Sequence, residues 1–223
     1  MTASVACVVP ALNAQSTLAE VCRGLRCAVP RAVVLVVDDG SADATSAVAR
    51  ACADVVIRFE RNRGKGAALR AGITEALARE ADLVVTIDAD GQHDPAYAPH
   101  LLAALDDADL AIGARARSGT MPLGRRLTNT LASVAVGRLT GVDVVDAQSG
   151  FRAMRRAVLL AVQATGDRYE YETDFLIRAL RAGYRIASVP VPTVYGAPSN
   201  FRRMRDSVRV VRAIWRHRAG AST

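Results

Sequence analysis

Four short polar segments in the first half of the chain carry the residue types best suited to chemistry, and each follows a run of apolar residues. The segments are Pro10-Ala11-Leu12-Asn13, Asp38-Asp39-Gly40-Ser41, Asn62-Arg63-Gly64-Lys65-Gly66 and Asp88-Ala89-Asp90-Gly91-Gln92-His93. In open α/β sheets, ligands bind beyond the carboxyl ends of the strands. One acidic turn could be only a helix cap, but four polar segments at one sheet edge predict a nucleotide site.

The fourth segment gives the strongest indication, because Asp88 and Asp90 lie one residue apart at the end of an apolar run. Two carboxylates so placed can reach one hard divalent cation together, and the amide of Gln92 offers a third oxygen. Mg²⁺ and Mn²⁺ prefer oxygen ligands and keep positions open for phosphates. We therefore expect Asp88, Asp90 and Gln92 to hold Mg²⁺ or Mn²⁺, with His93 in a structural role. The alternative is a turn with capping aspartates.

The third segment holds the only lysine of the chain, Lys65, since the other 28 of the 29 basic residues are arginine. Its flanking glycines let the backbone approach an anion, and the segment opens a predicted helix whose N-terminus favours negative charge. The spacing excludes a Walker A loop, and no GxGxxG follows the first apolar run. Asp38 and Asp39 of the second segment can accept hydrogen bonds from a base or a ribose, or can cap the next helix.

An alternation of strands and helices would position these segments. Apolar runs rich in β-branched residues lie at Val5–Val9, Val33–Val37, Val55–Ile57, Leu83–Ile87 and Leu110–Ile112, with alanine-rich helical segments near 15–28, 43–52, 66–80 and 94–107. Ser41, Asp43 and Asp94-Pro95 are typical of helix starts. Near-continuous apolar strands that alternate with helices predict an open α/β sheet, mostly parallel, with helices on both faces.

The second half is less regular and is best interpreted as an elaboration of the same sheet. We expect a mobile loop at 114–124, a helix at Arg125–Leu139, helices near 155–164 and 170–182, and a strand at Tyr184–Val189.

The chain has 223 residues, 51% of them hydrophobic and 23% charged, which is enough for one large domain with a sizeable core. No apolar run reaches the roughly 18–20 residues that span a bilayer, and the N-terminus lacks a signal-peptide pattern. We therefore expect a cytoplasmic protein. The four cysteines form no CxxC pair, which indicates reduced, packed thiols.

The formal net charge of +7 is concentrated at the C-terminus, because residues 198–223 hold seven arginines and one aspartate. Apolar residues recur there at helical steps: Phe201, Met204, Val208, Val211 and Trp215. A basic amphipathic helix can lie on an anionic membrane surface, and the alternative is a helix docked on the domain. The charge alone would also fit a nucleic-acid-binding module, but no aromatic stacking platform accompanies it.

Six motifs, in order along the chain, give the sequence a specific resemblance. They are VVPALNA, VVDDGSADAT, NRGKGAALRAGI, TIDADGQHDP, DAQSGFRAMRR and YETDFLIRALRAGYRIASVPVPTVY. The chain resembles the family 2 glycosyltransferases with the GT-A fold, and is most similar to their dolichyl-phosphate mannose synthase and polyprenyl-phosphate glycosyltransferase branch. The match, from about Val5 to about Arg212, implies one GT-A domain over 1–197, followed by the basic segment 198–223. Its nucleotide-binding half would be 1–113 and its acceptor-binding half 114–197.

The resemblance implies a nucleotide-sugar donor, a divalent metal and roles for particular residues. The donor would be bound by Pro10, Leu12, Asn13, Asp38, Asp39, Lys65, Asp88, Ala89 and Asp90. The acceptor phosphate would be bound by Arg115, Arg117, Arg125, Arg126, Ser149 and Arg202. The residues implied to act in catalysis are Asp90, Arg117, Arg126 and Arg152.

The implied reaction is an inverting transfer of a hexose, from a donor of the GDP-mannose or UDP-glucose type, to a polyprenyl or dolichyl phosphate. A lipid phosphate is already anionic near neutral pH, so it needs positive charge rather than a strong base, and the fork of arginine suits phosphate. A saccharide hydroxyl acceptor would instead need a carboxylate base, Glu172 or Asp174. The enzyme would be peripheral at the inner face of the membrane; a homo-oligomer or a separate membrane-protein partner stays open.

Two departures from the family pattern leave the nucleobase and one phosphate contact open. Relatives usually carry Pro-Thr-Tyr-Asn-Glu after the first strand, whereas this chain has Leu12 and Ala14 in place of the aromatic residue and the acid. Near the C-terminus relatives often have Ser-Lys or Ser-His, where this chain has Ser199-Asn200-Phe201-Arg202. Arg202 and Arg203 are the candidates to supply that charge.

Overall fold

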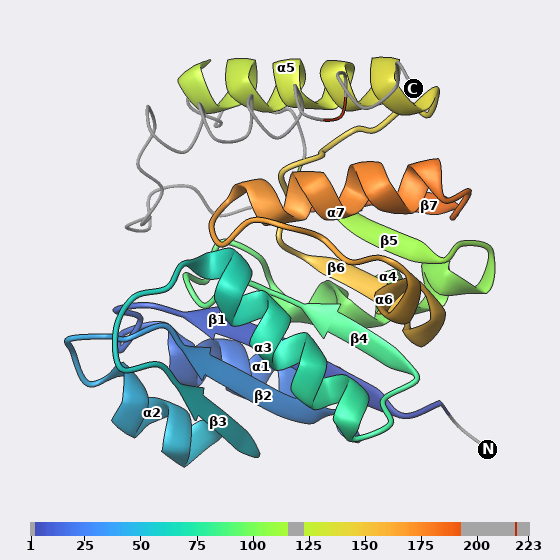
Figure 1. The fold of residues 1–223 in the computed structure, drawn as a ribbon. Coiled ribbons are helices and arrows are strands. Elements are labelled where there is room, and N and C mark those ends of the chain that lie inside the picture. Colours follow the sequence, from blue (N-terminus) through green and yellow to red (C-terminus); the bar gives the residue numbers. More distant parts are fainter. Residues whose placement is uncertain (1–2, 116–122, 193–216, 218–223) are drawn as a thin grey trace.

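The structure is a computed structural model that describes residues 3–115, 123–192 and 217, with the backbone alone for residues 123–128. Within these residues seven strands form one sheet, in the order β3-β2-β1-β4-β6-β5-β7 (Figure 1). The strands are β1 (Val5–Ala11), β2 (Val33–Asp38), β3 (Val55–Arg58), β4 (Leu83–Thr86), β5 (Leu110–Arg115), β6 (Arg152–Arg155) and β7 (Ile186–Val191). Of the described strands only β6 runs antiparallel to its neighbours. The expected α/β fold with an open, mostly parallel sheet is confirmed.

Helices fill the connections between the strands. They are α1 (Leu18–Ala28), α2 (Thr45–Cys52), α3 (Lys65–Ala78), α4 (Ala98–Ala103), α5 (Leu123–Thr140), α6 (Arg156–Ala161) and α7 (Glu170–Arg181), with the 3₁₀ turns η1 (Pro95–Tyr97) and η2 (Ala104–Asp106) on either side of α4. The expected helices are confirmed to within a few residues. The segment expected as one helix at 94–107 is instead a short α-helix between two 3₁₀ turns.

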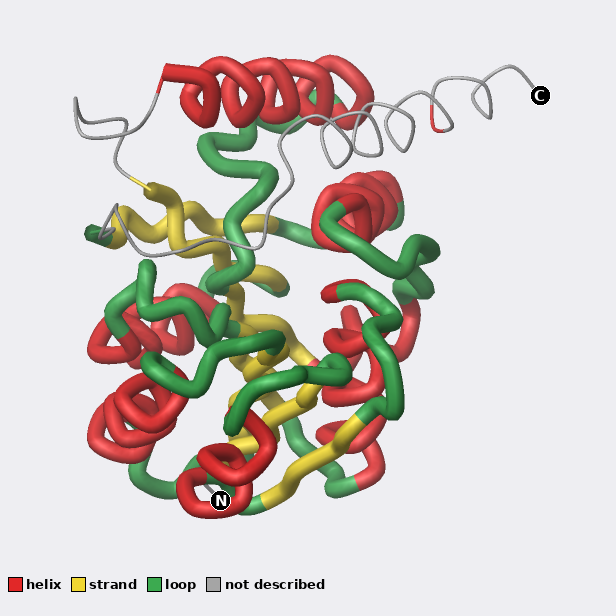
Figure 2. The backbone as a smooth tube through the Cα atoms, turned by 90° about the vertical axis from the view of Figure 1, so that its left-hand side faces the viewer, coloured by secondary structure: helices red, strands yellow, loops and turns green. Residues whose placement is uncertain are grey.

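Two apolar layers cover the sheet, one on each face. Because side chains alternate along a strand, Val8 of β1 enters one layer and its neighbours Cys7 and Val9 enter the other. The layer around Val8 is completed by residues of α3, α5, α6 and α7, and the opposite layer by residues of α1, α2 and α4. Figure 2 shows helices on both sides of the strands. Helix α5 lies over α7 (Figure 1) and packs against it.

Strand β6 is the described strand that the sequence pattern did not predict. Its four residues begin with Arg152 and end with Arg155, so the β-branched run that marks the other strands is missing. Ala153 and Met154 pair with β4 on one side and with β5 on the other, and both are buried. Pairing on two sides therefore outweighs a weak local strand preference.

The expected helix starts are confirmed at two positions and wrong at a third. Asp94 accepts a hydrogen bond from the Ala96 N–H (2.9 Å) at the start of η1, and Asp43 accepts one from the first N–H of α2 (3.0 Å). The Ser41 hydroxyl does not cap α2; it accepts a hydrogen bond from the N–H of Asn13 (2.9 Å). This bond ties the turn after β2 to the turn after β1.

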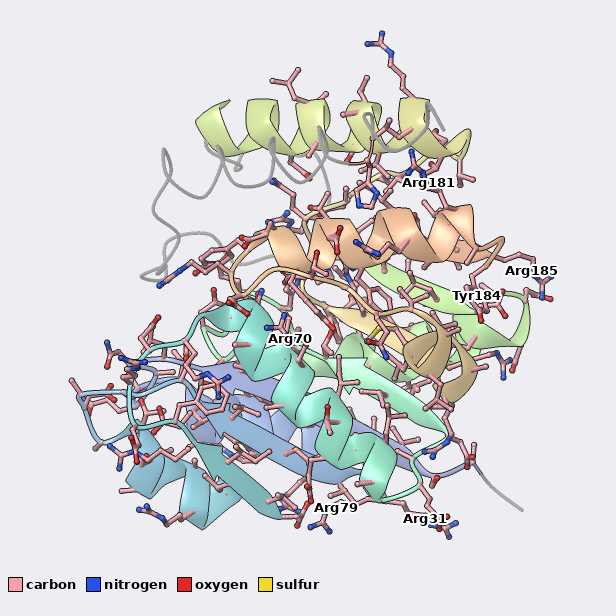
Figure 3. The ribbon with its side chains drawn as sticks, viewed as in Figure 1. Arg31, Arg70, Arg79, Arg181, Tyr184 and Arg185 are labelled. Atoms are coloured by element: carbon pink, nitrogen blue, oxygen red, sulfur yellow. The ribbon has the colours of Figure 1, made fainter. Side chains whose placement is uncertain are left out.

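The C-terminal segment is described only at His217, which lies on α7. Its ring Nε2 is 2.6 Å from Asp174 Oδ1, and Arg181 donates a hydrogen bond to its carbonyl oxygen (2.8 Å; Figure 3). The basic stripe expected at 201–216 and most of the loop expected at 114–124 lie outside the described residues.

Two further sequence expectations concern the membrane and the cysteines. No helix within the described residues combines the length and the apolar character that crossing a membrane requires. All four cysteines are free thiols, and Cys7 and Cys22 are buried.

Gly72→Ala should lower the free energy of unfolding, because a Cβ at this position of α3 would overlap the Val8 side chain of β1. We expect a loss of about 1–3 kcal/mol from overpacking, although alanine favours a helix by about 1 kcal/mol. Equilibrium unfolding in urea measures it. Thr74→Ala, on the exposed face of the same helix, is the control and should change stability by less than about 0.5 kcal/mol. Unchanged stability of Gly72→Ala would contradict this close packing of α3 on β1.

Candidate active site

A half-buried cluster of one lysine and two carboxylates lies at the carboxyl edge of the sheet, with Glu172 as its most buried member. Lys65 is the first residue of α3, Asp88 follows β4, and Glu172 lies in the first turn of α7. The Lys65 Nζ atom is 2.6 Å from Asp88 Oδ1 and 2.6 Å from Glu172 Oε1, and it lies 5.7 Å from the centre of the Tyr169 ring. Two segments expected to share the donor site are therefore brought together, and a residue from the second half of the chain joins them.

The electrostatic interactions within this cluster keep Lys65 and Asp88 ionised. Burial by itself lowers the pKa of Lys65, but the charges of Asp88 and Glu172 outweigh burial and raise that pKa above its ordinary value. Burial likewise raises the pKa of Asp88, but Lys65 outweighs it and the net pKa is lowered. The ammonium and the Asp88 carboxylate are therefore both ionised at neutral pH, and each stabilises the other in a site that excludes most water.

The segment after Asp88 forms a tight turn. The Asp90 carboxylate accepts a hydrogen bond from the backbone N–H of Gln92 (3.0 Å), and the carbonyl of Ala89 accepts one from the Thr17 hydroxyl (2.6 Å). His93 is buried beside the Phe151 ring, with 5.5 Å between ring centres. Burial lowers the pKa of His93 to about 4, so its imidazole is neutral at neutral pH. A neutral imidazole suits a structural role and a metal ligand equally, so the structural role expected for His93 stays a prediction.

Asp39 and Asp38 both bond to the protein itself. Asp39 accepts hydrogen bonds from the backbone N–H groups of Arg63 (2.6 Å) and Gly64 (2.9 Å), which fixes the loop that precedes Lys65. Burial raises the pKa of Asp39 above its ordinary value, although these two N–H groups favour its ionised form. Asp38 is fully buried and accepts from the Ser41 N–H (2.9 Å) and from the Ser46 hydroxyl of α2. The contact of Asp38 with the next helix is therefore present, and a contact with a base or a ribose, which can hold at the same time, stays a prediction.

The glycines around Lys65 contact protein rather than open space. Gly64 has a φ of +105°, a conformation that residues with a Cβ rarely adopt, and a Cβ there would overlap the carbonyl of Asp167. A Cβ on Gly66 would lie 2.7 Å from the Gly166 carbonyl. The N–H of Ala67 also donates to the Asp167 carbonyl (3.1 Å). These glycines therefore admit the segment before α7, and their contact with an anion stays a prediction. In the same contact, Arg70 of α3 (Figure 3) bonds to Gly166 and Asp167.

Arg115, expected at the acceptor phosphate, and Arg152, expected to act in catalysis, are both held by internal partners. Arg115, at the end of β5, forms a bidentate ion pair with the buried Asp146 (2.7 and 2.9 Å). Arg152 is 2% exposed and donates hydrogen bonds to the carbonyls of Ser149 (2.8 Å), Glu172 (2.8 Å) and Ala147 (3.0 Å). Arg152 therefore supports the chain beneath the site instead of facing a ligand as expected, because its donors are taken by backbone carbonyls.

The backbone at Ser149-Gly150 packs closely against the ion pair of Lys65 with Asp88. A Cβ on Gly150 would lie 2.7 Å from Lys65 Nζ and 2.8 Å from Asp88 Oδ2. The Gly150 carbonyl accepts a hydrogen bond from the Thr86 hydroxyl (2.8 Å), and Ser149 is buried. Sequence reasoning placed these residues beside the acceptor, and it missed this contact and the partner Asp146. The quoted motif contains Asp146, but nothing local indicates which arginine it pairs with.

The remaining residues expected at the site fall into three groups. Pro10 is within β1, and Leu12 and Asn13 follow it at the same sheet edge. Arg125 and Arg126 lie in the first turn of α5, where the backbone alone is described. Arg117 and Arg202 lie outside the described residues.

The two acids proposed as alternative bases differ in their surroundings. Glu172 contacts Lys65. Asp174, two residues on, accepts a hydrogen bond from the Thr165 N–H (2.7 Å) and pairs with Arg178 (2.9 Å) and His217 (2.6 Å). Asp174 is therefore committed to a structural network, and Glu172 is the acid of the pair that lies at the site.

The donor atoms fit an open site for a hard divalent cation. Asp88, Asp90 and Gln92 offer carboxylate and amide oxygens from one turn. Across the part of the chain that the structure describes, no three His, Cys, Asp or Glu side chains form a complete metal cage. Mg²⁺ is commonly bound by one or two carboxylates together with substrate phosphates rather than by an all-protein cage. This donor set therefore suits a cation that arrives with a phosphorylated ligand.

Comparison with known proteins shows the family and agrees with the fold. Residues 6–162 match the family model described as glycosyl transferase family 2. An undecaprenyl-phosphate mannosyltransferase of Micrococcus luteus is 36% identical over 201 residues, which cover 84% of this chain and 82% of that protein. A polyprenol monophosphomannose synthase of Mycolicibacterium smegmatis is 36% identical over 200 residues, with 82% and 75% covered.

A solved structure supports the fold alone. A glucosyl-3-phosphoglycerate synthase of Mycobacterium tuberculosis, in complex with Mn²⁺, UDP and glucosyl-3-phosphoglycerate, superposes with a TM-score of 0.79 at 24% identity. The superposition covers 96% of this chain and 80% of that one.

Asp146→Asn should lower the free energy of unfolding by about 3–5 kcal/mol, because it removes the bidentate charge partner of the largely buried Arg115 guanidinium. Equilibrium denaturation measures it. Glu75→Gln is the matched control, since the pair of Glu75 with Arg79 is largely exposed and such pairs contribute about 0.3–0.5 kcal/mol. Similar losses in both variants would contradict the buried pair.

The difference between wild type and Asp146→Asn should depend on pH. Burial raises the pKa of Asp146, but its bonds to Arg115 outweigh burial and lower that pKa below the ordinary value of 3.8. A carboxylate with a lowered pKa contributes its stability fully above the ordinary value and loses it as the pH falls towards the folded value. Stability measured from pH 7 to pH 3 should therefore show a constant difference down to about pH 4 and a shrinking one below it. A difference that grows on acidification would contradict the assignment.

Proposed function

This chain belongs to glycosyl transferase family 2, and from that premise we propose that it moves a hexose from a nucleotide sugar to a polyprenyl phosphate, with inversion and with a divalent metal. The observation that carries the proposal is the Lys65–Asp88–Glu172 cluster, which places one cation beside the Asp88–Asp90 turn at the carboxyl edge of the sheet. The names of the two relatives, both enzymes of polyprenol or undecaprenyl-phosphate mannose transfer, support the choice of acceptor.

The nucleotide sugar would lie along the edge formed by the ends of β1, β2 and β4. Pro10, Leu12 and Asn13 would face the nucleoside, together with Asp39, while Lys65, Ala89 and Asp90 would face the diphosphate. Asp38 supports this edge from below, because its carboxylate is bonded inside the protein. Lys65 would stabilise the negative charge that develops on the departing nucleoside diphosphate.

Asp88, Asp90 and Gln92 would hold Mg²⁺ or Mn²⁺. When bound, the metal would supply further positive charge to the leaving diphosphate. Structures of the superposable synthase contain Mn²⁺ or Mg²⁺ together with UDP, and the oxygen donors of this chain suit either ion.

The acceptor phosphate would be received on the side of α5. Arg117, Arg125, Arg126 and Arg202 are the candidates to bind it, and Arg117 and Arg126 are the ones we assign to catalysis. Arg115 and Arg152 would act through the segment 146–152, which their bonds hold against Lys65. The basic segment 198–223 would bring the enzyme to an anionic membrane surface on the cytoplasmic side, near a lipid acceptor.

A saccharide hydroxyl is the second candidate acceptor, and the position of Glu172 favours it. Glu172 lies within 2.6 Å of Lys65 and so is near the expected diphosphate. Such an acceptor would need Glu172 to take its proton. An assay that offers both kinds of acceptor separates the two candidates.

Purified protein should make a glycolipid when given a labelled nucleotide sugar, polyprenyl phosphate in detergent and Mn²⁺. Removal of the metal with EDTA should abolish transfer, and added Mn²⁺ or Mg²⁺ should restore it. Parallel reactions with GDP-mannose, UDP-glucose and soluble saccharides identify the donor and the acceptor. Product with saccharides alone would overturn the lipid-phosphate proposal.

Asp90→Asn should lower kcat/KM by about 100-fold or more, which corresponds to at least about 2.7 kcal/mol of lost transition-state stabilisation. Asp107→Asn makes the same change at an exposed residue before β5, at the opposite edge of the sheet, and should leave kcat/KM unchanged. Equal kcat/KM values for both variants would contradict the assignment of Asp90 as a metal ligand.

A further inference from the structure

Lys65 forms an ion pair with Asp88, one of the two carboxylates that the proposed function assigns to the metal. Its Nζ atom is 2.6 Å from Asp88 Oδ1, and Gly150 closes the site from another side, since a Cβ there would lie 2.7 Å from Nζ and 2.8 Å from Asp88 Oδ2. An ammonium ion and a divalent cation on the same half-buried carboxylate repel each other, and water screens that repulsion less than it would at an exposed site. A metal ion can therefore bind Asp88 fully only if the contact with Lys65 is weakened.

Glu172 gives Lys65 a second partner in the same place. The Lys65–Glu172 contact is as short as the contact to Asp88, at 2.6 Å. Lys65, Asp88 and Glu172 together carry a net charge of −1, so the lysine is neutralised without any ligand. A diphosphate would offer Lys65 a third anion, and Glu172 would keep the ammonium within the site while its partner changes.

We propose that Lys65 and the divalent metal compete for Asp88, so that metal and nucleoside diphosphate promote each other's binding as Lys65 passes from Asp88 to phosphate. This inference rests on the proposed function and deepens it. Coupling of this kind is reciprocal: each ligand raises the affinity for the other by the same factor. Competition by Lys65 implies that the metal alone binds weakly. Between turnovers, when no metal is bound, Lys65 neutralises the charge of the Asp88 carboxylate.

A single ¹⁵N label can follow this exchange in the wild-type protein, because Lys65 is the only lysine. Protein grown with ¹⁵N-lysine carries one side-chain Nζ resonance, which reports on the partners of the ammonium. We expect this resonance to move when MgCl₂ is added together with UDP or GDP. An unchanged resonance, with both ligands shown to be bound by calorimetry, would overturn the proposal.

Calorimetry on Lys65→Met tests the competition itself. The affinity for Mg²⁺ should rise at least about 10-fold in the absence of nucleotide, and should stay within about threefold of wild type when UDP or GDP saturates the protein. Arg63→Met is the matched control, because Arg63 is exposed, stacks on Phe59 and lies two residues from Lys65; it should change both affinities equally and slightly. An equal rise in both affinities of Lys65→Met would mean that Lys65 acts as a fixed charge, and the proposal would fall.

The two proposals fail in different ways. Absence of both metal and nucleotide binding would overturn the proposed function and the inference together. Glycosyl transfer that persists while Lys65→Met shows the equal rise would overturn the inference alone. If Lys65→Met does not fold, because Glu172 and Asp88 lose their shared partner, the lysine resonance of the wild type still decides.

Discussion

The ion pairs of Lys65 with Asp88 and Glu172 are the constraint on which the arrangement of the site depends. Removing three charged groups from water is costly unless each finds partners at close range. That requirement joins three elements remote in sequence: the start of α3, the turn after β4 and the first turn of α7. It also requires a small residue nearby, since a side chain at Gly150 would displace the ammonium or the Asp88 carboxylate.

Around this cluster, a layer of internally satisfied charges fixes the backbone. Asp39 holds the loop before Lys65, Arg115 and Asp146 hold the end of β5 against the segment before β6, and Arg152 bonds to three carbonyls including that of Glu172. Such charges are poor ligand contacts because their donors and acceptors are already used. Their effect is to hold the backbone around the cluster in one geometry, which is a form of the preorganisation that electrostatic catalysis requires.

Most of the sheet could be predicted from the sequence, because its buried strands are apolar runs rich in β-branched residues, as at Val33–Asp38. Strand β6 could not be predicted, because its formation depends on pairing with β4 and β5 rather than on the strand preference of Arg152–Arg155. The position of the site followed from where strands end. The partners within it did not, since contacts such as Arg115 with Asp146 join residues about thirty positions apart. Glycine positions were correctly noted, but whether Gly64 meets an anion or the carbonyl of Asp167 depends on where α7 packs.

The single antiparallel strand among those described determines which segments of the chain reach the carboxyl edge of the sheet. A parallel strand brings to this edge only the residues that come after its carboxyl end, but β6 runs the other way, and its first residue, Arg152, pairs with Thr86 at the end of β4. Residues that precede β6 therefore lie at the same edge of the sheet as residues that follow β4. The chain between β5 and β6 can thus be lengthened, shortened or reshaped without shifting the register of the parallel strands. One reversed strand thus makes the segment between β5 and β6 structurally independent of the segments that follow β1, β2 and β4.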